Sequence, residues 1–129
     1  MQIRIQLSYI SADRFFHSTQ PVSGPVHIQT NVNVVGAEMR EQILSVPFVV
    51  SINYSPSVAQ ISIKGEAIVS GNPDELQKLK SDYEAKRPPP PDLIQAITNT
   101  SLVEATVISR SLNIPPPVPL PSMEPRPTA

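Results

Sequence analysis

Histidine, aspartate and serine are the residue types of this chain that could take part in catalysis or metal binding. There are two histidines, His17 and His27, and Asp13 is the carboxylate that could assist His17. A metal site needs several ligands held close together, and a Ser–His–Asp triad needs a nucleophile on a sharp turn. Neither pattern is present, and His27 falls on the polar side of an alternating segment. We therefore predict no catalytic residue and no metal site.

Other kinds of chemistry need residues that the chain lacks. It contains no cysteine, which excludes disulfides, cysteine-ligated zinc and thiol catalysis. Its 4 glycines are not clustered, so no phosphate-cradling loop is expected. The acidic pairs Glu38/Glu41 and Asp74/Glu75 lie in charged segments, where solvation or helix capping explains them. The sequence therefore predicts a non-enzymatic protein without a cofactor.

Length and charge exclude further classes. The chain has 129 residues, with 10 basic and 11 acidic side chains and a net charge of −1. This length fits one domain, and no basic stripe favours nucleic acid. Residues 1–10 alternate between polar and apolar, unlike a signal peptide, and no apolar run reaches the length of a membrane span. We expect a cytoplasmic protein that neither inserts into a membrane nor binds nucleic acid.

The segment from Leu44 to Tyr54, LSVPFVVSINY, is the centre of the predicted fold. Its even positions are all apolar or aromatic and its odd positions are mostly small or polar, which is typical of a strand with one buried face. Three further segments alternate in the same way and are predicted to be strands: 2–9, 26–34 and 61–69.

Three residues in these strands indicate local detail. Pro47 lacks an N–H, which predicts an edge position or a bulge. Gly65 in mid-strand predicts a bulge or close packing over the sheet. Tyr9 shares the parity of the apolar residues before it, so we expect its side chain on the apolar face.

Two helices are predicted after the strands. Asn72 is suited to cap the first helix and Pro73 to begin it, and the helix must end before the run Pro88–Pro91. Asp92 is suited to cap the second region, which forms either one long helix or two short ones. Its later apolar residues predict a broad face that lies on the sheet, and these residues are Leu102, Val103, Ala105, Val107, Ile108 and Leu112.

The strands and helices together predict an α+β fold. Four meandering strands form an antiparallel sheet, two helices pack on one of its faces, and an extended Pro-rich C-terminal tail follows. We expect a single domain over residues 1–123 and a disordered tail over 124–129. The tail has PxxP spacing that SH3-type modules recognise, but packing of its apolar residues along the parent domain is the favoured interpretation.

Short motifs in the second half resemble the SecB-like superfamily of protein-export chaperones. The stretch 61–71 alternates apolar residues around Gly65 and ends at Gly71, and a proline-led helix begins with Pro91-Asp92-Leu93-Ile94. An apolar-Pro-Pro run at 114–121 completes the resemblance. The aromatic-rich start of the last helix and the acidic docking surface of typical members are absent, so the chain resembles a divergent relative.

The resemblance implies a function in polypeptide binding. SecB-like proteins hold non-native polypeptide in apolar grooves between sheet and helices without ATP, and they assemble through strand edges and helices. The partner would be an unfolded chain or a dedicated protein, with homo-oligomerisation through a sheet edge. The candidate contact residues are Phe15, Phe16, Phe48, Val49, Tyr54, Ile114, Val118 and Leu120.

A role in the core competes with binding at each of these positions. The parity of Phe48 and Tyr54 favours the core, whereas Val49 on the outer face is the best groove candidate. The competing functional class is a structural or assembly adaptor that is docked permanently in a larger complex, with a ribosome- or RNA-associated complex as one alternative.

Overall fold

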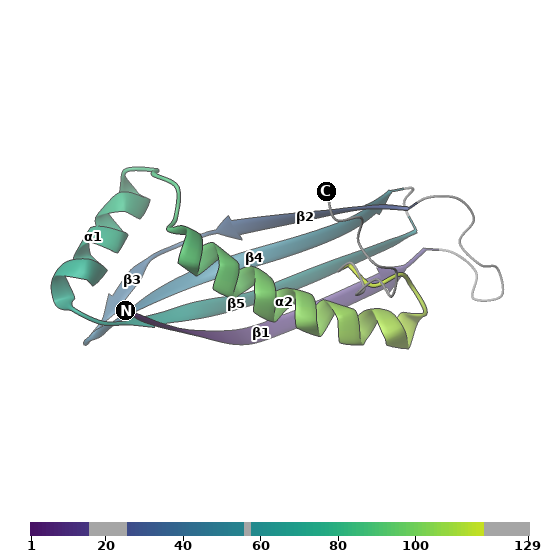
Figure 1. The fold of residues 1–129 in the computed structure, drawn as a ribbon, viewed down its shortest axis with the longest axis horizontal. Helices are drawn as coiled ribbons and strands as arrows, with labels where there is room; N and C mark the ends of the chain where they lie inside the picture. The colour runs from purple at the N-terminus through teal and green to yellow at the C-terminus, as the bar shows by residue number, and fades with distance from the viewer. Residues whose placement is uncertain (16–25, 56–57, 118–129) are drawn as a thin grey trace, which may run out of the picture.

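The computed structural model describes residues 1–15, 26–55 and 58–117. One antiparallel sheet is followed by two helices (Figure 1), which confirms the predicted α+β fold. The sheet has five strands, because a short strand that the sequence analysis did not predict precedes the central one. The elements are β1 (Gln2–Arg14), β2 (His27–Val34), β3 (Glu38–Arg40), β4 (Ile43–Ser55), β5 (Ala59–Ser70), α1 (Pro73–Glu84) and α2 (Pro91–Leu112).

The strand order is β1-β5-β4-β2, with β3 also pairing with β4. β2, β4 and β5 are neighbours in chain order, as in the predicted meander. β1 differs, because it pairs with β5 and not with β2. β1 pairs with β5 along its whole length, from Gln2 opposite Ser70 to Arg14 opposite Ala59. The first and second strands therefore lie at opposite edges of the sheet, since the long apolar face of β5 offers β1 a full-length partner.

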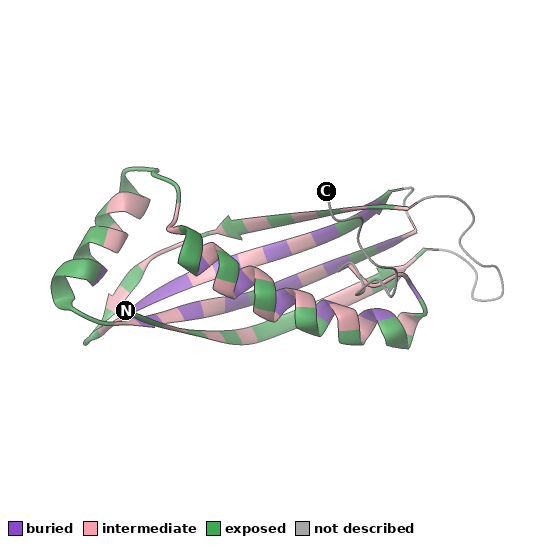
Figure 2. Cartoon of the chain, viewed as in Figure 1, coloured by how far each residue is buried: buried purple, intermediate pink, exposed green. Residues whose placement is uncertain are grey.

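β4 is the central strand, as its pattern predicts. The side chains of its even positions, from Leu44 to Tyr54, are all at most 3 % exposed. They pack with the odd positions of β5, such as Ile61 and Ile63, and together these residues form most of the core. Figure 2 shows the buried positions concentrated in β4 and β5, with the edge strands only half buried.

A bulge in β1 changes the prediction for Tyr9. The pairing with β5 shifts by one residue between Leu7 and Tyr9, so Tyr9 lies opposite Lys64 and not on the apolar face. The extra residue at Ser8 reverses the alternation beyond it. Gly65 lies opposite Leu7, and a Cβ atom there would be 2.4 Å from the carbonyl oxygen of Gln6 and 3.1 Å from Phe48 Cζ. The close packing predicted at Gly65 is thus present, whereas the bulge lies in the neighbouring strand β1 and not in β5.

Pro47 lies where the pairing partner of β4 changes from β2 to β3. β2 pairs with β4 up to Val34, β3 pairs from Glu38 onward, and the N–H of Val35 donates to the carbonyl oxygen of Pro47 at 2.8 Å. The N–H and C=O of a strand residue point to the same side, so the missing N–H of Pro47 is on the side where the partner changes. β4 is an internal strand, and the edge position considered for Pro47 is wrong.

α1 begins as predicted and packs at one end of the sheet. The Asn72 side chain accepts a hydrogen bond from the N–H of Asp74 at 2.9 Å, and Pro73 is the first helical residue. Leu76 is the buried residue of this helix. The remaining positions are half buried or exposed, because the helix lies beside the end of the sheet and not over its face (Figure 1).

α2 is one continuous helix that crosses one face of the sheet (Figure 1). It begins at Pro91 after Pro90, without a side-chain cap, so the predicted cap at Asp92 is wrong. Because Pro91 takes the first helical position, Asp92 lies inside the first turn and Pro90, which has no side chain able to accept a hydrogen bond, precedes the helix. No helix in the described ranges combines the length and apolar character needed to cross a membrane.

The buried stripe of α2 differs from the predicted one. The residues that face the sheet include Ile97, Ser101 and Ala105, whereas Val103 and Val107 are 62 % and 58 % exposed. Small side chains at four-residue spacing let the helix backbone approach the sheet closely. The prediction that Val103 and Val107 lie on the sheet is therefore wrong, because they are on the opposite side of the helix.

The segment after α2 is fixed to the sheet. Asn113 takes a left-handed conformation (φ 54°) that ends the helix, and Ile114 is buried. The hydroxyl of Tyr54 then donates a hydrogen bond of 2.6 Å to the carbonyl oxygen of Pro115. The predicted disordered stretch 124–129 lies outside the described residues.

Candidate functional site

The residues predicted to contact a partner do not form one surface. Phe48, Tyr54 and Ile114 are inside the core and present little surface to a partner. Phe15 is 56 % exposed just after β1, and Val49 is half buried on the face away from α2. The remaining three candidates, Phe16, Val118 and Leu120, lie outside the described residues.

The residues considered for catalysis are also separate from one another. Asp13 and His27 are exposed on β1 and β2, which form opposite edges of the sheet, and His17 is outside the described residues. Within the described ranges, no three His, Cys, Asp or Glu side chains gather where they would hold a metal ion.

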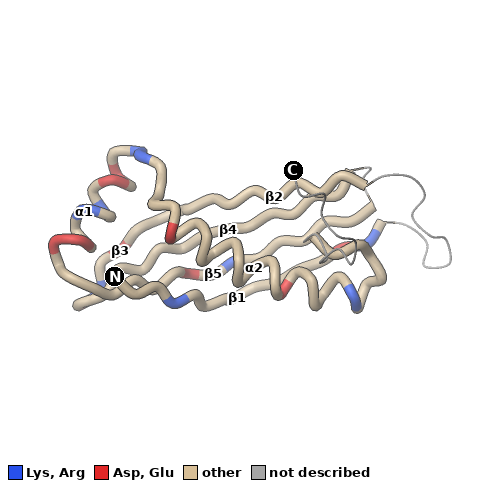
Figure 3. The backbone as a smooth tube through the Cα atoms, in the orientation of Figure 1, with Lys and Arg blue, Asp and Glu red and all other residues tan. Residues whose placement is uncertain are grey.

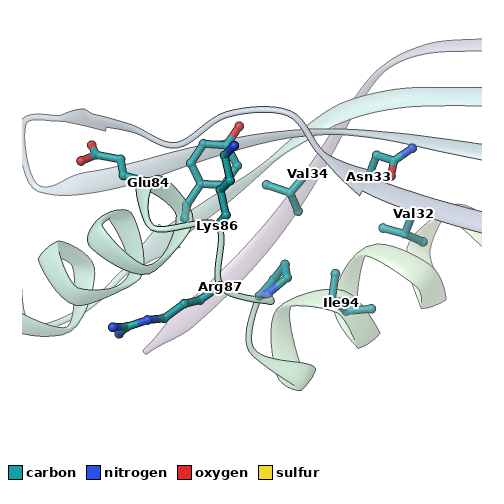
Figure 4. Close-up of a pocket in the computed structure, with 9 residues that line it drawn as sticks. Val32, Asn33, Val34, Glu84, Lys86, Arg87 and Ile94 are labelled. Atoms are coloured by element: carbon teal, nitrogen blue, oxygen red, sulfur yellow. The ribbon is translucent and has the colours of Figure 1, made fainter.

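An open groove lies where the end of β2 meets the connection between the helices (Figure 4). Its volume is about 440 Å³. Val32 and Ile94 face each other from β2 and the start of α2, and Val34 lies beside them. The residues that line this groove are Val32, Asn33, Val34, Tyr83, Glu84, Lys86, Arg87, Pro89 and Ile94. We call it the β2–α2 groove.

The wall of the β2–α2 groove is held by hydrogen bonds in the connection. The N–H groups of Lys86 and Arg87 donate to the carbonyl oxygens of Tyr83 and Asp82, both at 2.9 Å. Arg87 also forms an ion pair with Asp82, with 3.0 Å between Nη1 and Oδ1. The run Pro88–Pro91 then restricts the backbone, because each ring fixes its φ angle. The wall is therefore set in place before any partner binds.

A well-packed layer supports the groove from below. A void of only about 20 Å³ is lined by Val34, Ala37, Val46, Leu79 and Leu93 together with Pro88, Pro89 and Pro90. The fully buried members of this layer, such as Val46 and Leu93, belong to the core of the domain. The groove floor is thus continuous with the core, since Val32 and Val34 pack against it.

The chemistry of the groove is an apolar floor with a charged rim. Val32, Val34, Pro89 and Ile94 are half buried, whereas Glu84 and the other charged lining residues are exposed. Figure 3 shows that Lys, Arg, Asp and Glu gather on α1 and its connection, while the sheet and α2 carry few. Such a groove is suited to apolar side chains whose flanking polar groups remain in water.

The patterns in the sequence do not predict this groove. Val32 and Val34 follow the apolar parity of their strand, which predicts core residues, and Ile94 was part of a helix predicted to lie on the sheet. The sequence feature that could have indicated the groove is the proline run, which ends one helix and begins the next beside the sheet. Only the strand order, with β2 at an edge, leaves these valines partly open.

A second apolar surface lies on the outer side of α2. Asn99, Leu102, Val103, Thr106 and Val107 line a shallow depression of about 450 Å³. No described element covers it. The two valines are spaced four residues apart on the side opposite the sheet, and this spacing was visible in the sequence.

Burial alters the acid–base behaviour of Tyr54. Removal of the side chain from water raises the pKa of Tyr54 to about 12, because the charged phenolate is disfavoured there. The neutral hydroxyl is the form that donates to Pro115. This contact lies near the end of α2, away from the β2–α2 groove, and its role is to hold the chain that leaves the helix.

Comparison with known proteins identifies the fold. No protein-family model matches the chain, and a search of curated proteins finds no match. Among solved structures, the chain is similar to a SecB-like chaperone of Mycobacterium tuberculosis in complex with a ChAD peptide from an antitoxin. The TM-score is 0.61 at 12 % identity, over 94 % of this chain and 89 % of that chain. The chain therefore has a divergent SecB-like fold, as its motifs predicted.

Proposed function

We propose that this protein binds non-native or extended polypeptide in the β2–α2 groove and that it does so without ATP. The observation that carries the proposal is an open groove whose apolar floor continues the core and whose rim is charged. The fold supports it, because the similar SecB-like structure is a chaperone in complex with a peptide.

The physical basis is the burial of apolar surface. An unfolded chain exposes side chains that a folded protein would cover, and transfer of their surface from water stabilises a complex by about 25 cal/mol per Å². A groove that exists before binding avoids the cost of ordering its own walls. Burial of apolar surface supplies binding energy without a nucleotide, and the sequence offers no phosphate-cradling loop for one.

Further parts of the proposal come from the sequence. Phe15 and Val49 are retained as additional contacts, because their side chains reach the surface. Phe16, Val118 and Leu120 are retained on their sequence pattern alone. We place the protein in the cytoplasm, without a cofactor, and include self-association through a sheet edge other than the outer side of β2.

A test compares two valine-to-aspartate variants that lie three residues apart. Val32→Asp puts a charge on the groove floor, whereas Val35→Asp changes a residue that is 55 % exposed and does not line the groove. The assay measures light scattering of a chemically denatured client protein diluted into ATP-free buffer. Thermal melts identify any variant that is simply unfolded.

We expect the wild type and Val35→Asp to suppress aggregation at near-stoichiometric amounts and Val32→Asp to fail while still folded. If the wild type suppresses the aggregation of none of the clients, the proposal is wrong. Equal suppression by the two variants would place the binding site elsewhere.

The second candidate is an adaptor with one permanent partner. It is favoured by the apolar surface around Val103 and Val107, which a fixed subunit would cover. Affinity purification followed by mass spectrometry separates the two. A single partner in constant ratio supports the adaptor, and many partners that disappear with Val32→Asp support the chaperone.

A further inference from the structure

The outer edge of β2 carries a row of backbone groups whose direction the structure defines. The bond from the N–H of Val35 to Pro47 makes these two residues a hydrogen-bonded pair in the β2–β4 register. Such pairs alternate along an antiparallel ladder, so Gln29, Asn31 and Asn33 bond to β4. The N–H and C=O groups of the residues between them point to the open edge, and these residues are Ile28, Thr30, Val32 and Val34.

The two edges of the sheet differ in protection against an added strand. β1 carries a bulge at Ser8 and the charged residues Arg4, Asp13 and Arg14, which are features that disfavour further pairing. β2 pairs with β4 without a register shift, and its sequence HIQTNVNV has no proline, lysine or carboxylate. In the ranges 26–55 and 58–117, and in 1–15, no strand covers the outer side of β2.

The open edge and the β2–α2 groove share the same residues. Val32 and Val34 direct their backbone groups outward and contribute their side chains to the groove floor. A strand added beside β2 would run about 4.8 Å away, and every second side chain of it would lie on the face of α2. One such side chain, opposite Val32 or Val34, would enter the groove beside Ile94 and Pro89.

We propose that β2 binds its polypeptide partner by antiparallel strand addition, with apolar residues at alternate positions of the partner facing α2 and one of them filling the groove. This inference rests on the proposed function and specifies its binding mode. The antiparallel direction follows the other pairs of the sheet, all of which are antiparallel, and this is also the more stable ladder.

A second copy of this chain fits the edge less well than an extended segment does. A β2 strand from another copy offers only Ile28, Thr30, Val32 and Val34 on the face of α2. These side chains are short and β-branched, and the groove has a volume of about 440 Å³. An aromatic or long aliphatic residue fills more of such a volume, which favours a segment of a different polypeptide.

The probe that tests this is a fluorescein-labelled peptide, Thr-Val-Thr-Phe-Thr-Val-Thr, blocked at both ends. In antiparallel addition, the residues that face α2 are also those that exchange hydrogen bonds with β2. One analogue is N-methylated at Val, Phe and Val, and the matched control is N-methylated at three of the threonines. Both methylated peptides lose three N–H donors, but only the peptide methylated at Val, Phe and Val loses the donors that would face β2.

We expect the peptide and the threonine-methylated control to bind full-length protein, and the other analogue to bind roughly tenfold or more weakly in fluorescence anisotropy. Thr30→Pro is the protein counterpart, because it removes an outward N–H and leaves the bonds of β4 in place. We expect the same loss for this variant, with unchanged folding in thermal melts.

The outcomes separate this inference from the proposed function. Equal binding of both methylated peptides, or loss with the threonine-methylated one alone, overturns strand addition even if denatured clients are still held. If the wild type binds neither clients nor the peptide, the proposed function fails and this inference with it. If Thr30→Pro instead converts a dimer to a monomer in sedimentation experiments without peptide, the edge is a self-interface and the proposal is wrong.

Discussion

The two faces of the sheet differ sharply, although the same strands supply both. On β4, Val50 is fully buried on the face that α2 crosses, whereas its neighbour Val49 is only half buried on the other face. The second face carries polar and charged residues such as Lys64 and Glu66, and no described element covers it. Stability is therefore concentrated on one face, while the other is free to vary in sequence or to contact other molecules.

The largest effect is expected from Phe48→Ala on the covered face. Phe48 is 1 % exposed in the centre of the core, so its truncation leaves a cavity under α2. The free energy of unfolding should fall by about 3–5 kcal/mol in urea denaturation. Val49→Ala on the other face is the matched control and should cost less than about 1 kcal/mol. Similar losses for the two variants would contradict the difference between the faces.

Gly65→Ala tests how tightly the covered face is packed at the bulge. The added Cβ would meet the Gln6 carbonyl oxygen at 2.4 Å and the Phe48 ring at 3.1 Å, so backbone or ring must shift. We expect a loss of about 1–3 kcal/mol in the same denaturation assay. A neutral effect would show that the β1 bulge can move away from β5 without cost.

Tyr54→Phe removes one hydrogen bond and leaves the rest of the covered face unchanged. The loss of the bond to Pro115 should lower the free energy of unfolding by about 1 kcal/mol at neutral pH. Because burial raises the pKa of Tyr54 from 10.0 to about 12, the stability linked to this hydroxyl is fully present below pH 10 and is lost as the pH rises toward 12.

The melting temperatures of the wild type and Tyr54→Phe should therefore converge between pH 10 and pH 12. The comparison is made by thermal melts of both proteins at each pH. A constant difference across this range would show that Tyr54 is not held as the neutral hydroxyl.

The smallest effect is expected from Lys64→Met on the uncovered face. The Lys64 ammonium lies 5.0 Å from the centre of the Tyr9 ring, and exposed contacts of this kind contribute about 0.5 kcal/mol. The variant should unfold within about 0.5 kcal/mol of the wild type, and Tyr9→Leu serves as the partner control. A loss as large as that of Gly65→Ala would mean that this face is more important for stability than its exposure indicates.

Features that depend on neighbouring residues could be predicted from the sequence. The alternation in β4 identified the central strand, because a strand with one covered face needs apolar residues at every second position. Asn72 and Pro73 identified the start of α1, since both act on the first turn that follows them. Gly65 was correctly connected with close packing, although its bulge partner was not known.

Features that depend on distant residues could not be predicted in this way. Tyr9 was assigned to the wrong face because the bulge at Ser8 arises from the pairing with β5. Val103 and Val107 were assigned to the sheet because they are more apolar than Ser101 and Ser109, which occupy the buried positions. A hydrophobic scale ranks side chains, but the close approach of a helix to a sheet selects small ones.

The sequence by itself determined the α+β class, the central strand, the start of α1 and the resemblance to SecB-like proteins. Each of these rests on periodicity or on short motifs, whose physical causes act within a few residues. The tertiary structure alone decided that β1 and β2 form opposite edges, and it placed Val32, Val34 and Ile94 around one groove. That arrangement depends on which strands pair, and strand pairing is set by contacts between residues far apart in the chain.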